Sequence, residues 1–503
     1  MSKFYITTPL YYVNDKPHLG TAYTTILADV ISRYYKTMNE DVFFLTGTDE
    51  HGQKVQEAAA KRQIEPKVHV DEYVIEFKKL WEKLHIDYDD FIRTTEKRHI
   101  DKVKKILQQL FDDGEIYKDK YEGMYSVSEE RFITQKEAEE GEFREVKKLV
   151  EENYFFKMSK YQSKLIKYIK NNPEFIQPEG RKNEVLGFLN KPLNDLCISR
   201  PKSRLKWGIE LPFDNNYVTY VWFDALLNYI TAIGWDHNEE SFRETWPANY
   251  HLIGKDILTT HAVYWPTMLL AIGLPLPKTI FAHGWWLSGE SKMSKSLGNI
   301  INPLNLIDKY GVDSLRYFLM KEMVLGKDST FTIDLFIERY NSDLANDFGN
   351  LVNRVTILIH KHFNSRIPEP GNYNEIDLEL IGFAKTTPQL VIKDIENLKI
   401  PDGIEKILIL MRKINKYLEV KSPWKSIKSD SSQRSEAATT MYISADLLRI
   451  CSQLLNPVMP NKTSVILKML GSTSIQINNY STNLVKVGQK LGNGKSPFPR
   501  ILI

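Results

Sequence analysis

The chain has 503 residues, 42% hydrophobic and 26% charged side chains, and a formal net charge of +3. These values are ordinary for a globular protein of about three domains, and they exclude a disordered or fibrous chain. The charge excludes a strong overall attraction to nucleic acid, although local basic patches can still bind RNA.

Three further properties set the compartment that we expect. The sequence has no apolar run of about 18 residues, which predicts no membrane-spanning helix. The start, Met1 to Phe4, has no apolar signal region, so we expect a cytoplasmic protein. Cys197 and Cys451 lie far apart, which predicts two buried thiols and excludes a disulfide framework or a cysteine-rich zinc site.

Residues 1–110 alternate strand-like and helix-like patterns. Residues 4–8 read FYITT, typical of a short strand, and a helical pattern begins at about Leu19. The apolar run Val42 to Leu45 predicts a strand covered on both faces that ends at Thr46-Gly47. This order predicts a βαβ unit with a parallel sheet, followed by helices over residues 66–84 and 97–111.

The pattern changes twice along the rest of the chain. Charged and turn-rich segments predict an inserted subdomain, and strands are expected again at residues 217–222, 250–253 and 279–282. Helical periodicity then covers about 333–470. We expect an α/β fold with a Rossmann-like parallel-sheet domain, an inserted connective subdomain and an α-helical bundle. The predicted parts are residues 1–113, 114–215, 216–290, 291–345 and 346–503.

The segment His18-Leu19-Gly20-Thr21 lies at the start of the first predicted helix. A helix N-terminus attracts phosphate through its unpaired N–H groups and the positive end of its dipole. Gly20 lets a ligand approach the backbone, and His18 can donate to a phosphate oxygen. An ordinary polar contact of His18 is the alternative.

The second segment is cationic: Lys292-Met293-Ser294-Lys295-Ser296 lies between two glycines after a predicted strand. Lysines on a mobile loop suit the transient neutralisation of a triphosphate. A solvated surface loop is the alternative. The near copy at residues 157–160 (KMSK) lacks flanking glycines and runs into a helical pattern, so we expect no such role there.

The third segment, residues 46–52 (TGTDEHG), ends the second predicted strand. Ligands bind at the carboxyl ends of parallel strands, and Asp49 can pair there with an ammonium group. A helix cap is the alternative for Asp49.

Together these segments resemble the class I aminoacyl-tRNA synthetases. Residues 18–21 are similar to the "HIGH" signature of that family, and residues 292–296 are identical to its "KMSKS" signature. The resemblance narrows to the methionyl-tRNA synthetases of the bacterial short type without zinc-binding cysteines, and it covers essentially the whole chain. The blocks that carry it are residues 5–12, 44–52, 220–225, 253–256 and 283–285.

This resemblance implies ATP-dependent joining of L-methionine to tRNA(Met), with Mg²⁺ accompanying ATP. It implies a methionine site of Leu10, Tyr12, Asp49, Trp222, Ala225, Tyr229, Ile257, His261 and Trp265. The implied ATP site is His18, Gly20, Gly254, Asp256, His283, Gly284, Lys292 and Lys295, with His18, Thr21, Lys292 and Lys295 as catalytic residues. Asn350, Arg354 and Trp424 are the implied anticodon-binding residues.

The residues alone leave other interpretations open. The buried aromatic residues of the implied methionine site have the composition of plain core packing, and Asn350 and Arg354 suit a solvated helix face. A synthetase for another amino acid, a small nucleotidylyltransferase and an inactive RNA-binding relative are the alternative functions. Intact Lys292, Lys295, His18 and Asp49 count against the inactive relative.

The chain departs from the family pattern at two places. Thr21 stands where the first signature has its second histidine, and a hydroxyl can bond a phosphate oxygen but carries no charge. Residues 125–130 (YSVSEE) have serines and glutamates where many relatives have zinc-binding cysteines, so we expect no zinc and no other bound metal. The short tail from Gly471 is too small for an appended dimerisation domain, so we expect a monomer that binds no membrane.

Overall fold

The computed structural model describes residues 3–13, 16–126, 131–133, 146–236, 239–289, 291–292, 301–427, 431–472, 475, 485–492 and 496–502. The chain forms two compact units. Unit 1 comprises Met1–Pro17, Val42–Glu82 and Ile86–His283, and unit 2 comprises His18–Asp41, Lys83–His85 and Gly284–Ile503.

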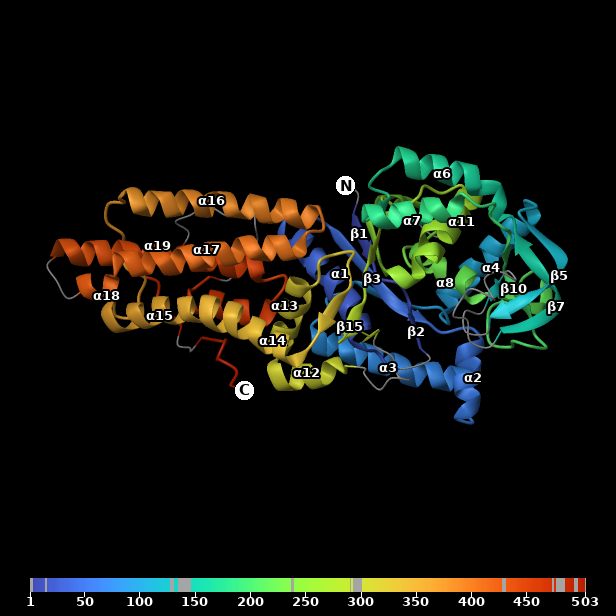
Figure 1. Ribbon diagram of the computed structural model, residues 1–503, viewed down its shortest axis with the longest axis horizontal. Helices are drawn as coiled ribbons and strands as arrows, with labels where there is room; N and C mark the ends of the chain where they lie inside the picture. The colour runs from blue at the N-terminus through green and yellow to red at the C-terminus, as the bar shows by residue number, and fades with distance from the viewer. Residues whose placement is uncertain are drawn as a thin grey trace. The chain divides into compact units, whose positions relative to one another are not determined.

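Unit 1 contains a seven-stranded parallel sheet, of which β1, β2 and β3 are labelled in Figure 1. Its order is β2-β3-β1-β13-β14-β8, with β4 also paired to β3, and every pairing is parallel. The strands are β1 (Phe4–Thr7), β2 (Tyr11–Tyr12), β3 (Val42–Asp49), β4 (Asp90–Arg93), β8 (Ile176–Gln177), β13 (Tyr250–Gly254) and β14 (Thr279–His283). The predicted parallel-sheet domain is therefore confirmed, together with strands at 4–8, 42–45, 250–253 and 279–282.

Strand β3 is longer than its apolar run predicted. It continues through Thr46-Gly47 to Asp49, because β4 pairs with it from Leu45 to Thr48. Glycine is needed inside this strand, since a Cβ at Gly47 would lie 2.0 Å from the carbonyl oxygen of Ile92 in β4. The extension makes Asp49 the last residue of β3.

Helices of unit 1 include α2 (Gln53–Lys61), α3 (Pro66–Leu84), α4 (Lys97–Asp112), α8 (Val221–Leu226), α9 (Asn228–Thr231), α10 (Glu239–Thr245) and α11 (Trp265–Ile272). A π-helical turn, Thr260–Tyr264, precedes α11. The helices predicted over 66–84 and 97–111 are confirmed as α3 and α4. The strand predicted at residues 217–222 was wrong at its end: the chain turns at Tyr220, so that Trp222 lies in α8.

The region of the predicted insertion contains two antiparallel sheets. One has the order β6-β5-β7-β9, formed by Arg131–Ile133, Ile116–Ser126, Val146–Phe156 and Leu196–Cys197. The other has the order β10-β12-β11, formed by Ser199–Pro201, Asp214–Thr219 and Glu210–Leu211. In the sequence between β7 and β9, α6 (Gln162–Asn171) and α7 (Glu179–Leu189) flank β8, which joins the parallel sheet beside β14.

Unit 2 is mainly helical, as the periodicity predicted (Figure 1). Its helices are α1 (Leu19–Thr37), α12 (Pro303–Tyr310), α13 (Val312–Glu322), α14 (Ile333–Arg339), α15 (Asn350–His362), α16 (Glu375–Glu396), α17 (Ile400–Lys421), α18 (Pro423–Ser426), α19 (Ser431–Leu455) and α20 (Pro460–Met469). A π-helical segment, Tyr340–Gly349, joins α14 to α15. A small sheet contains β15 (Trp286–Ser288), β16 (Ser291–Lys292) and β17 (Ser329–Phe331).

A buried ion pair holds several segments of unit 2 together. Arg316 of α13 and Asp29 of α1 are fully buried, and Nη2 of Arg316 lies 2.5 Å from the Asp29 carboxylate. The same guanidinium donates to the carbonyl oxygens of Leu84, Pro457 and Val458. Because a buried charge without partners is strongly destabilising, these bonds fix the position of α1 within unit 2.

Both cysteines are buried and free, as predicted. Among the helices that the structure describes, none is long and apolar enough to cross a membrane.

Candidate active site

The carboxyl end of β3 is followed by buried ionisable side chains whose partners are well defined. Glu50 accepts hydrogen bonds from Nε and Nη2 of Arg93, at 2.6 and 3.0 Å, and from Oγ1 of Thr48 at 2.7 Å. The buried Glu50 carboxylate therefore stabilises the end of β3 and is not directed at a ligand.

Asp49 is the register partner of Tyr12 in β2, so these two residues lie next to each other at the sheet edge. Asp49 is 5% exposed. The hydroxyl of Tyr12 donates to the carbonyl oxygen of His51 at 2.9 Å, which fixes the ring. Gly52 is the N-cap of α2, so the alternative of Asp49 as the cap of that helix is wrong.

Four aromatic side chains of the implied methionine site form a cluster, which we call the aromatic cluster: Trp222, Tyr229, His261 and Trp265. The Tyr229 ring centroid lies 5.9 Å from that of His261 and 5.7 Å from that of Trp265. The Trp222 ring meets the His261 ring edge to face at 6.3 Å. Tyr229 and Trp265 are fully buried whereas Trp222 is half-buried, so Trp222 is the cluster member that solvent or a ligand reaches most easily.

Hydrogen bonding fixes the proton positions in the aromatic cluster. Burial lowers the pKa of His261 to about 4, so the imidazole is neutral at pH 7. Its Nδ1 lies 3.0 Å from the carbonyl oxygen of Ile257, which can only accept, so Nδ1 carries the proton. Nε2 is then an acceptor, and the Tyr229 hydroxyl donates to it at 2.8 Å.

This arrangement limits what the polar ends of Tyr12 and His261 can offer to a ligand. Each of these side chains has a donor that could bond the weakly accepting sulfur of methionine. Both donors instead bond backbone carbonyl oxygens, those of His51 and Ile257. A thioether beside this cluster would therefore gain mainly packing and sulfur–aromatic contacts.

His251 of β13 packs against the aromatic cluster, and it was not identified from the sequence as part of the site. Its ring stacks on Tyr229 with centroids 4.2 Å apart. Burial lowers the pKa of His251 well below 6.5, so the ring is neutral. Its Nε2 accepts from the Trp265 indole at 3.2 Å, which leaves Nδ1 to donate to Thr7 at 2.8 Å.

A second unpredicted group connects the strand end to α8. Asp224 is fully buried and accepts from Nδ1 of His51 at 2.9 Å, while Nε2 of His99 lies 3.6 Å away. Burial alone would raise the pKa of Asp224, but the two imidazoles outweigh it and lower the pKa. Asp224 lies between Trp222 and Ala225 in α8, so this carboxylate anchors the helix that carries both residues. In the sequence, Asp224 is marked only by its position in residues 220–225, one of the blocks that resemble the family. His51 lies in another such block, residues 44–52.

The neighbouring strands β13 and β14 bring implied ATP-binding residues to the same edge of the parallel sheet. Gly254 ends β13, His283 ends β14, and the two are register partners. A Cβ at Gly254 would lie 2.5 Å from Oδ1 of Asp256, so glycine leaves room for that carboxylate beside the backbone. Asp256 is exposed, as a residue that binds a ribose hydroxyl needs to be.

The first signature lies in unit 2, at the start of α1. His18 is the N-cap, and its Nδ1 accepts from the Gly20 N–H at 3.1 Å. The local polar contact named as the alternative is therefore present, and it leaves the His18 proton on Nε2, where it can be donated. A Cβ at Gly20 would lie 3.0 Å from the His18 ring, and Thr21 is largely buried.

The remaining phosphate-site residues are described only in part. A Cβ at Gly284 would lie 2.1 Å from the carbonyl oxygen of Lys327, which explains the glycine by backbone packing. Lys292 pairs through its backbone in β16 with Leu287 of β15. Lys295 lies outside the described residues, as do residues 127–130, on which the zinc prediction depends. Among the residues that are described, no cluster of metal-binding side chains occurs.

The near copy of the second signature has a structural role in unit 1. Residues Met158–Tyr161 form a 3₁₀ turn in which Met158 and Tyr161 are buried. Lys160 forms an ion pair with Glu115. The expectation that this copy is not a phosphate-binding loop agrees with its packing.

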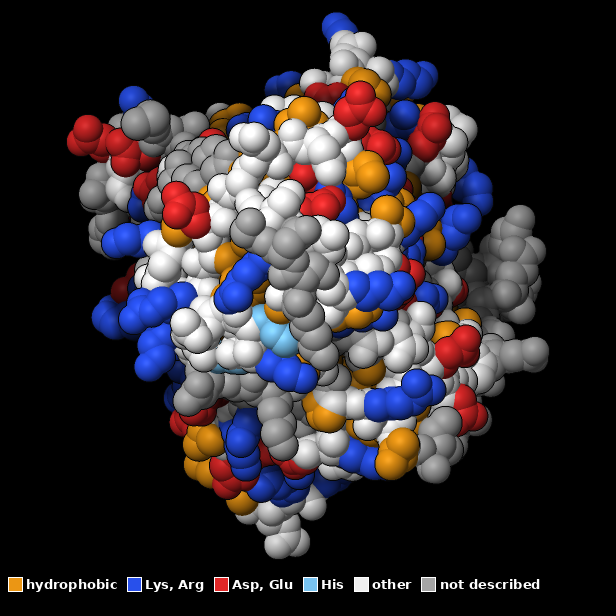
Figure 2. All heavy atoms as spheres, turned by 90° about the vertical axis from the view of Figure 1, so that its left-hand side faces the viewer, with side chains coloured by type: hydrophobic (Ala, Val, Ile, Leu, Met, Phe, Trp, Pro, Cys, Tyr) orange, Lys and Arg blue, Asp and Glu red, His pale blue; other side chains and the backbone are white. Residues whose placement is uncertain are grey.

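The implied anticodon-binding residues lie on the helices of unit 2. Asn350 and Arg354 are one turn apart on α15, and Arg354 pairs with Glu419 of α17 at 3.2 Å. Trp424 is 39% exposed in α18, after the left-handed residue Ser422 that ends α17. Figure 2 shows this end of unit 2, where Lys and Arg side chains are spread over the middle of the surface.

Comparison with known proteins accounts for this combination of residues. The family "tRNA synthetases class I (M)" matches residues 4–142 and 138–356, and the family "Anticodon binding domain of methionyl tRNA ligase" matches residues 367–498. Methionine–tRNA ligases of Clostridium acetobutylicum and Bacillus subtilis are 45% and 43% identical, over 99% of this chain and 78% of each relative.

Solved structures agree with the sequence relatives. Methionyl-tRNA synthetase of Mycobacterium tuberculosis in complex with methionyl-adenylate superposes with a TM-score of 0.95 at 38% identity, covering 99% of this chain and 100% of that one. The free form of the same protein gives a TM-score of 0.87 at 35% identity, covering 100% and 99%. On this evidence the chain belongs to the methionine–tRNA ligases, a family of class I aminoacyl-tRNA synthetases.

Proposed function

We propose that the chain activates L-methionine with ATP and transfers it to the 3′ end of tRNA(Met), using the residues described above. Asp49, Gly254 and His283 stand at the carboxyl ends of parallel strands in one sheet, and this common edge is the observation that carries the assignment. Ligands of such sheets bind at that edge.

In the methionine site, Asp49 would pair with the substrate ammonium. The thioether would lie against the aromatic cluster and the surrounding residues Leu10, Tyr12, Ala225 and Ile257. Tyr229 and His251 keep the buried rings in a single orientation through three hydrogen bonds. The Tyr229 hydroxyl donates to His261, the Trp265 indole donates to His251, and His251 donates to the Thr7 hydroxyl. This site selects a long unbranched apolar side chain by shape and polarisable contact.

In the first step, the methionine carboxylate attacks the α-phosphorus of ATP in line, and pyrophosphate leaves. In the second, a ribose hydroxyl of tRNA attacks the carbonyl carbon of methionyl-adenylate, and AMP leaves. The residues act by positioning and charge stabilisation, without a covalent enzyme intermediate. His18 would donate through Nε2, Lys292 and Lys295 would neutralise the phosphates, and Asp256 would bind a ribose hydroxyl.

Thr21 would supply a hydroxyl to the phosphates, and Gly20 would allow close approach of the nucleotide to the backbone. Gly284 would contact the nucleotide through its own backbone, because the carbonyl group of Lys327 occupies the space of a side chain there. Mg²⁺ would accompany ATP and share in neutralising its phosphates, without an all-protein cage.

In the helical unit, Asn350 and Arg354 would hydrogen-bond splayed anticodon bases, and Trp424 would stack on one. The exposed Trp424 ring and the position of both polar residues on one face of α15 support this. Residues 346–503 would form the anticodon-binding part, residues 291–345 the signature loop and stem contact, residues 1–113 with 216–290 the catalytic part, and residues 114–215 the insertion. We further propose a cytoplasmic monomer without zinc.

Amino-acid-dependent ATP–pyrophosphate exchange across the twenty amino acids tests the activity. Methionine alone should support rapid exchange. Exchange with a different amino acid would reassign the substrate, and no exchange with any of them would favour an inactive RNA-binding relative.

A further inference from the structure

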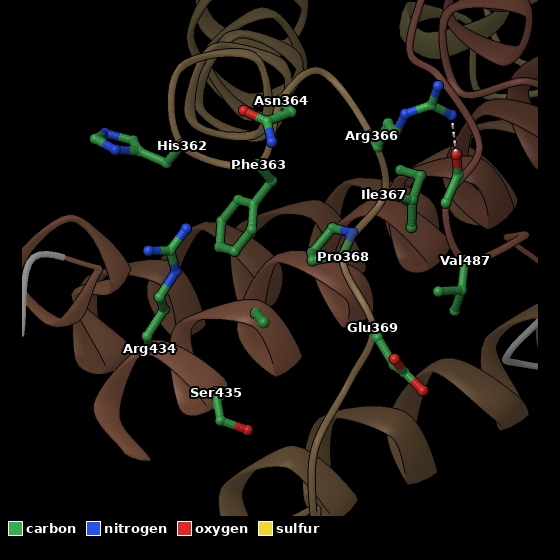
Figure 3. A pocket seen from close by; sticks show the side chains of 12 residues that line it. His362, Phe363, Asn364, Arg366, Ile367, Pro368, Glu369, Arg434, Ser435 and Val487 are labelled. Carbon is green, nitrogen blue, oxygen red and sulfur yellow. Dashed lines mark hydrogen bonds between the residues drawn. The ribbon is translucent and has the colours of Figure 1, made fainter. Parts of the chain in front are cut away.

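A groove in the helical unit is lined by residues to which the proposed function assigns no role. Its volume is about 450 Å³, and it is open to solvent. It lies where the end of α15 and the following segment meet α19 and the C-terminal tail (Figure 3). This volume is in the range of small-ligand sites, roughly 300–1,000 Å³, and so suits one nucleotide better than a duplex.

The groove combines an apolar floor with cationic edges. Phe363 points into it between Arg434 and Pro368, as Figure 3 shows. Arg434 is exposed, so its guanidinium is accessible to solvent. The amide of Asn364 and the hydroxyl of Ser435 add hydrogen-bonding groups, and among the described lining residues Glu369 is the single carboxylate.

Backbone pairing builds one wall of the groove. Ile367 N–H donates to Gln489 at 2.9 Å, Gly488 N–H donates to Ile367 at 2.9 Å, and Leu491 N–H donates to Ser365 at 2.8 Å. Arg366 also donates to the carbonyl oxygen of Gly488 at 2.8 Å. The tail is thus fixed against the segment after α15, which gives the groove a defined shape.

The turn before this wall has an uncommon backbone conformation. Asn364 and Ser365 both have left-handed backbones, with φ of 52° and 56°. Such conformations are uncommon for residues other than glycine, although asparagine adopts them more readily than most. Here they reverse the chain directly after Phe363, at the point where its ring enters the groove.

We propose that this groove binds an unstacked RNA nucleotide together with its phosphate, and so forms a second contact with tRNA on the helical unit. An aromatic ring with an adjacent guanidinium is the usual pair for a base and its phosphate in single-stranded RNA. The inference rests on the proposed function, since it takes tRNA as the partner. It differs from that proposal in using no residue of the Asn350, Arg354 and Trp424 set.

Two variants test the groove. Phe363→Leu removes the stacking plane but keeps an apolar side chain, and we expect binding of an anticodon stem–loop oligoribonucleotide to weaken at least about five-fold. Arg434→Ala removes one phosphate contact, so the slope of log Kd against log salt should fall in magnitude by about one. Arg434→Lys should restore most of that slope.

Lys385→Ala is the matched control, because Lys385 is an exposed cation on α16 outside the groove. It should change neither the Kd nor its salt dependence by comparison with the unchanged chain. Pyrophosphate exchange and circular dichroism check that each variant is folded, and Arg434→Ala carries the test if Phe363→Leu proves unstable.

The outcomes separate this inference from the proposed function. If Phe363→Leu and Arg434→Ala bind the stem–loop like Lys385→Ala while Trp424→Ala is impaired, the groove is not an RNA site and the proposed function stands. If the unchanged chain binds no stem–loop and charges no tRNA, both proposals fail.

Discussion

Protonation of His261 should make unit 1 unstable in mild acid. Burial holds the pKa of this imidazole at about 4, whereas an unfolded histidine titrates near 6.5. The unfolded chain therefore takes up a proton at higher pH than the folded chain does. The contribution of His261 to the free energy of unfolding is fully present above pH 6.5 and is lost as the pH falls toward 4.

The size of the effect follows from the two pKa values. The loss from His261 is about 2 kcal/mol at pH 5 and about 3 kcal/mol at pH 4, by comparison with pH 7.5. For a unit of this size, 2 kcal/mol corresponds to roughly 4–8 °C in the unfolding midpoint. Other buried groups, among them His251, add to the acid sensitivity of the whole chain, so the contribution of His261 must be measured as a difference.

Thermal unfolding of the unchanged chain and of His261→Gln between pH 7.5 and pH 5 isolates this contribution. His261→Gln should be less stable at pH 7.5, and the gap between the two midpoints should narrow by roughly 4–8 °C at pH 5. Tyr229→Phe is the control: it loses the hydrogen bond to Nε2 but keeps the imidazole, so its acid sensitivity should persist. Parallel midpoint curves for the unchanged chain and His261→Gln would refute the reasoning.

Four further predictions concern the proposed activity. Lys295→Ala should lower the adenylation rate about 10²- to 10³-fold by removing charge stabilisation, with the KM for methionine nearly unchanged in pyrophosphate exchange; an unaltered rate would remove Lys295 from the mechanism. Trp424→Ala should lower kcat/KM for tRNA at least about five-fold while sparing adenylate formation, and equal losses in both assays would indicate a folding role. Asp224→Asn keeps the side-chain shape but weakens a charged hydrogen bond to His51, so the KM for methionine should rise about tenfold and the KM for ATP should stay within about two-fold. An equal rise of both constants would contradict a local positioning role for Asp224. Elemental analysis of the purified protein should find zinc well below one atom per chain, and stoichiometric zinc would overturn that expectation.

Much of the fold was predictable because its signals are local. Parallel strands buried on both faces are continuous apolar runs, and helices of the second unit repeat their apolar residues every three or four positions. The two signatures and Asp49 were recognisable for the same reason, since each occupies a short stretch next to a predicted strand or helix. The family was indicated by the resemblance of these segments to known signatures, which occur in the right order and each after a predicted strand.

Other features depend on partners far away in the sequence. The end of β3 could not be placed from its own residues, because β4 extends it and only Gly47 admits the close approach of Ile92. Strand β8 has two residues and joins the parallel sheet only through β14. The position of Asp224 also depends on a distant partner, because its contact residue His51 lies 173 positions away in the sequence.

The sequence by itself determined the class of fold, the family and the residue types available for methionine, ATP and RNA. Only the tertiary structure decided what those side chains can still offer to a ligand. The donors of Tyr12 and His261 are used by backbone carbonyls, and His261 is neutral because it is buried. Protonation state and hydrogen-bond capacity follow from surroundings assembled from distant segments, and local sequence carries no record of them.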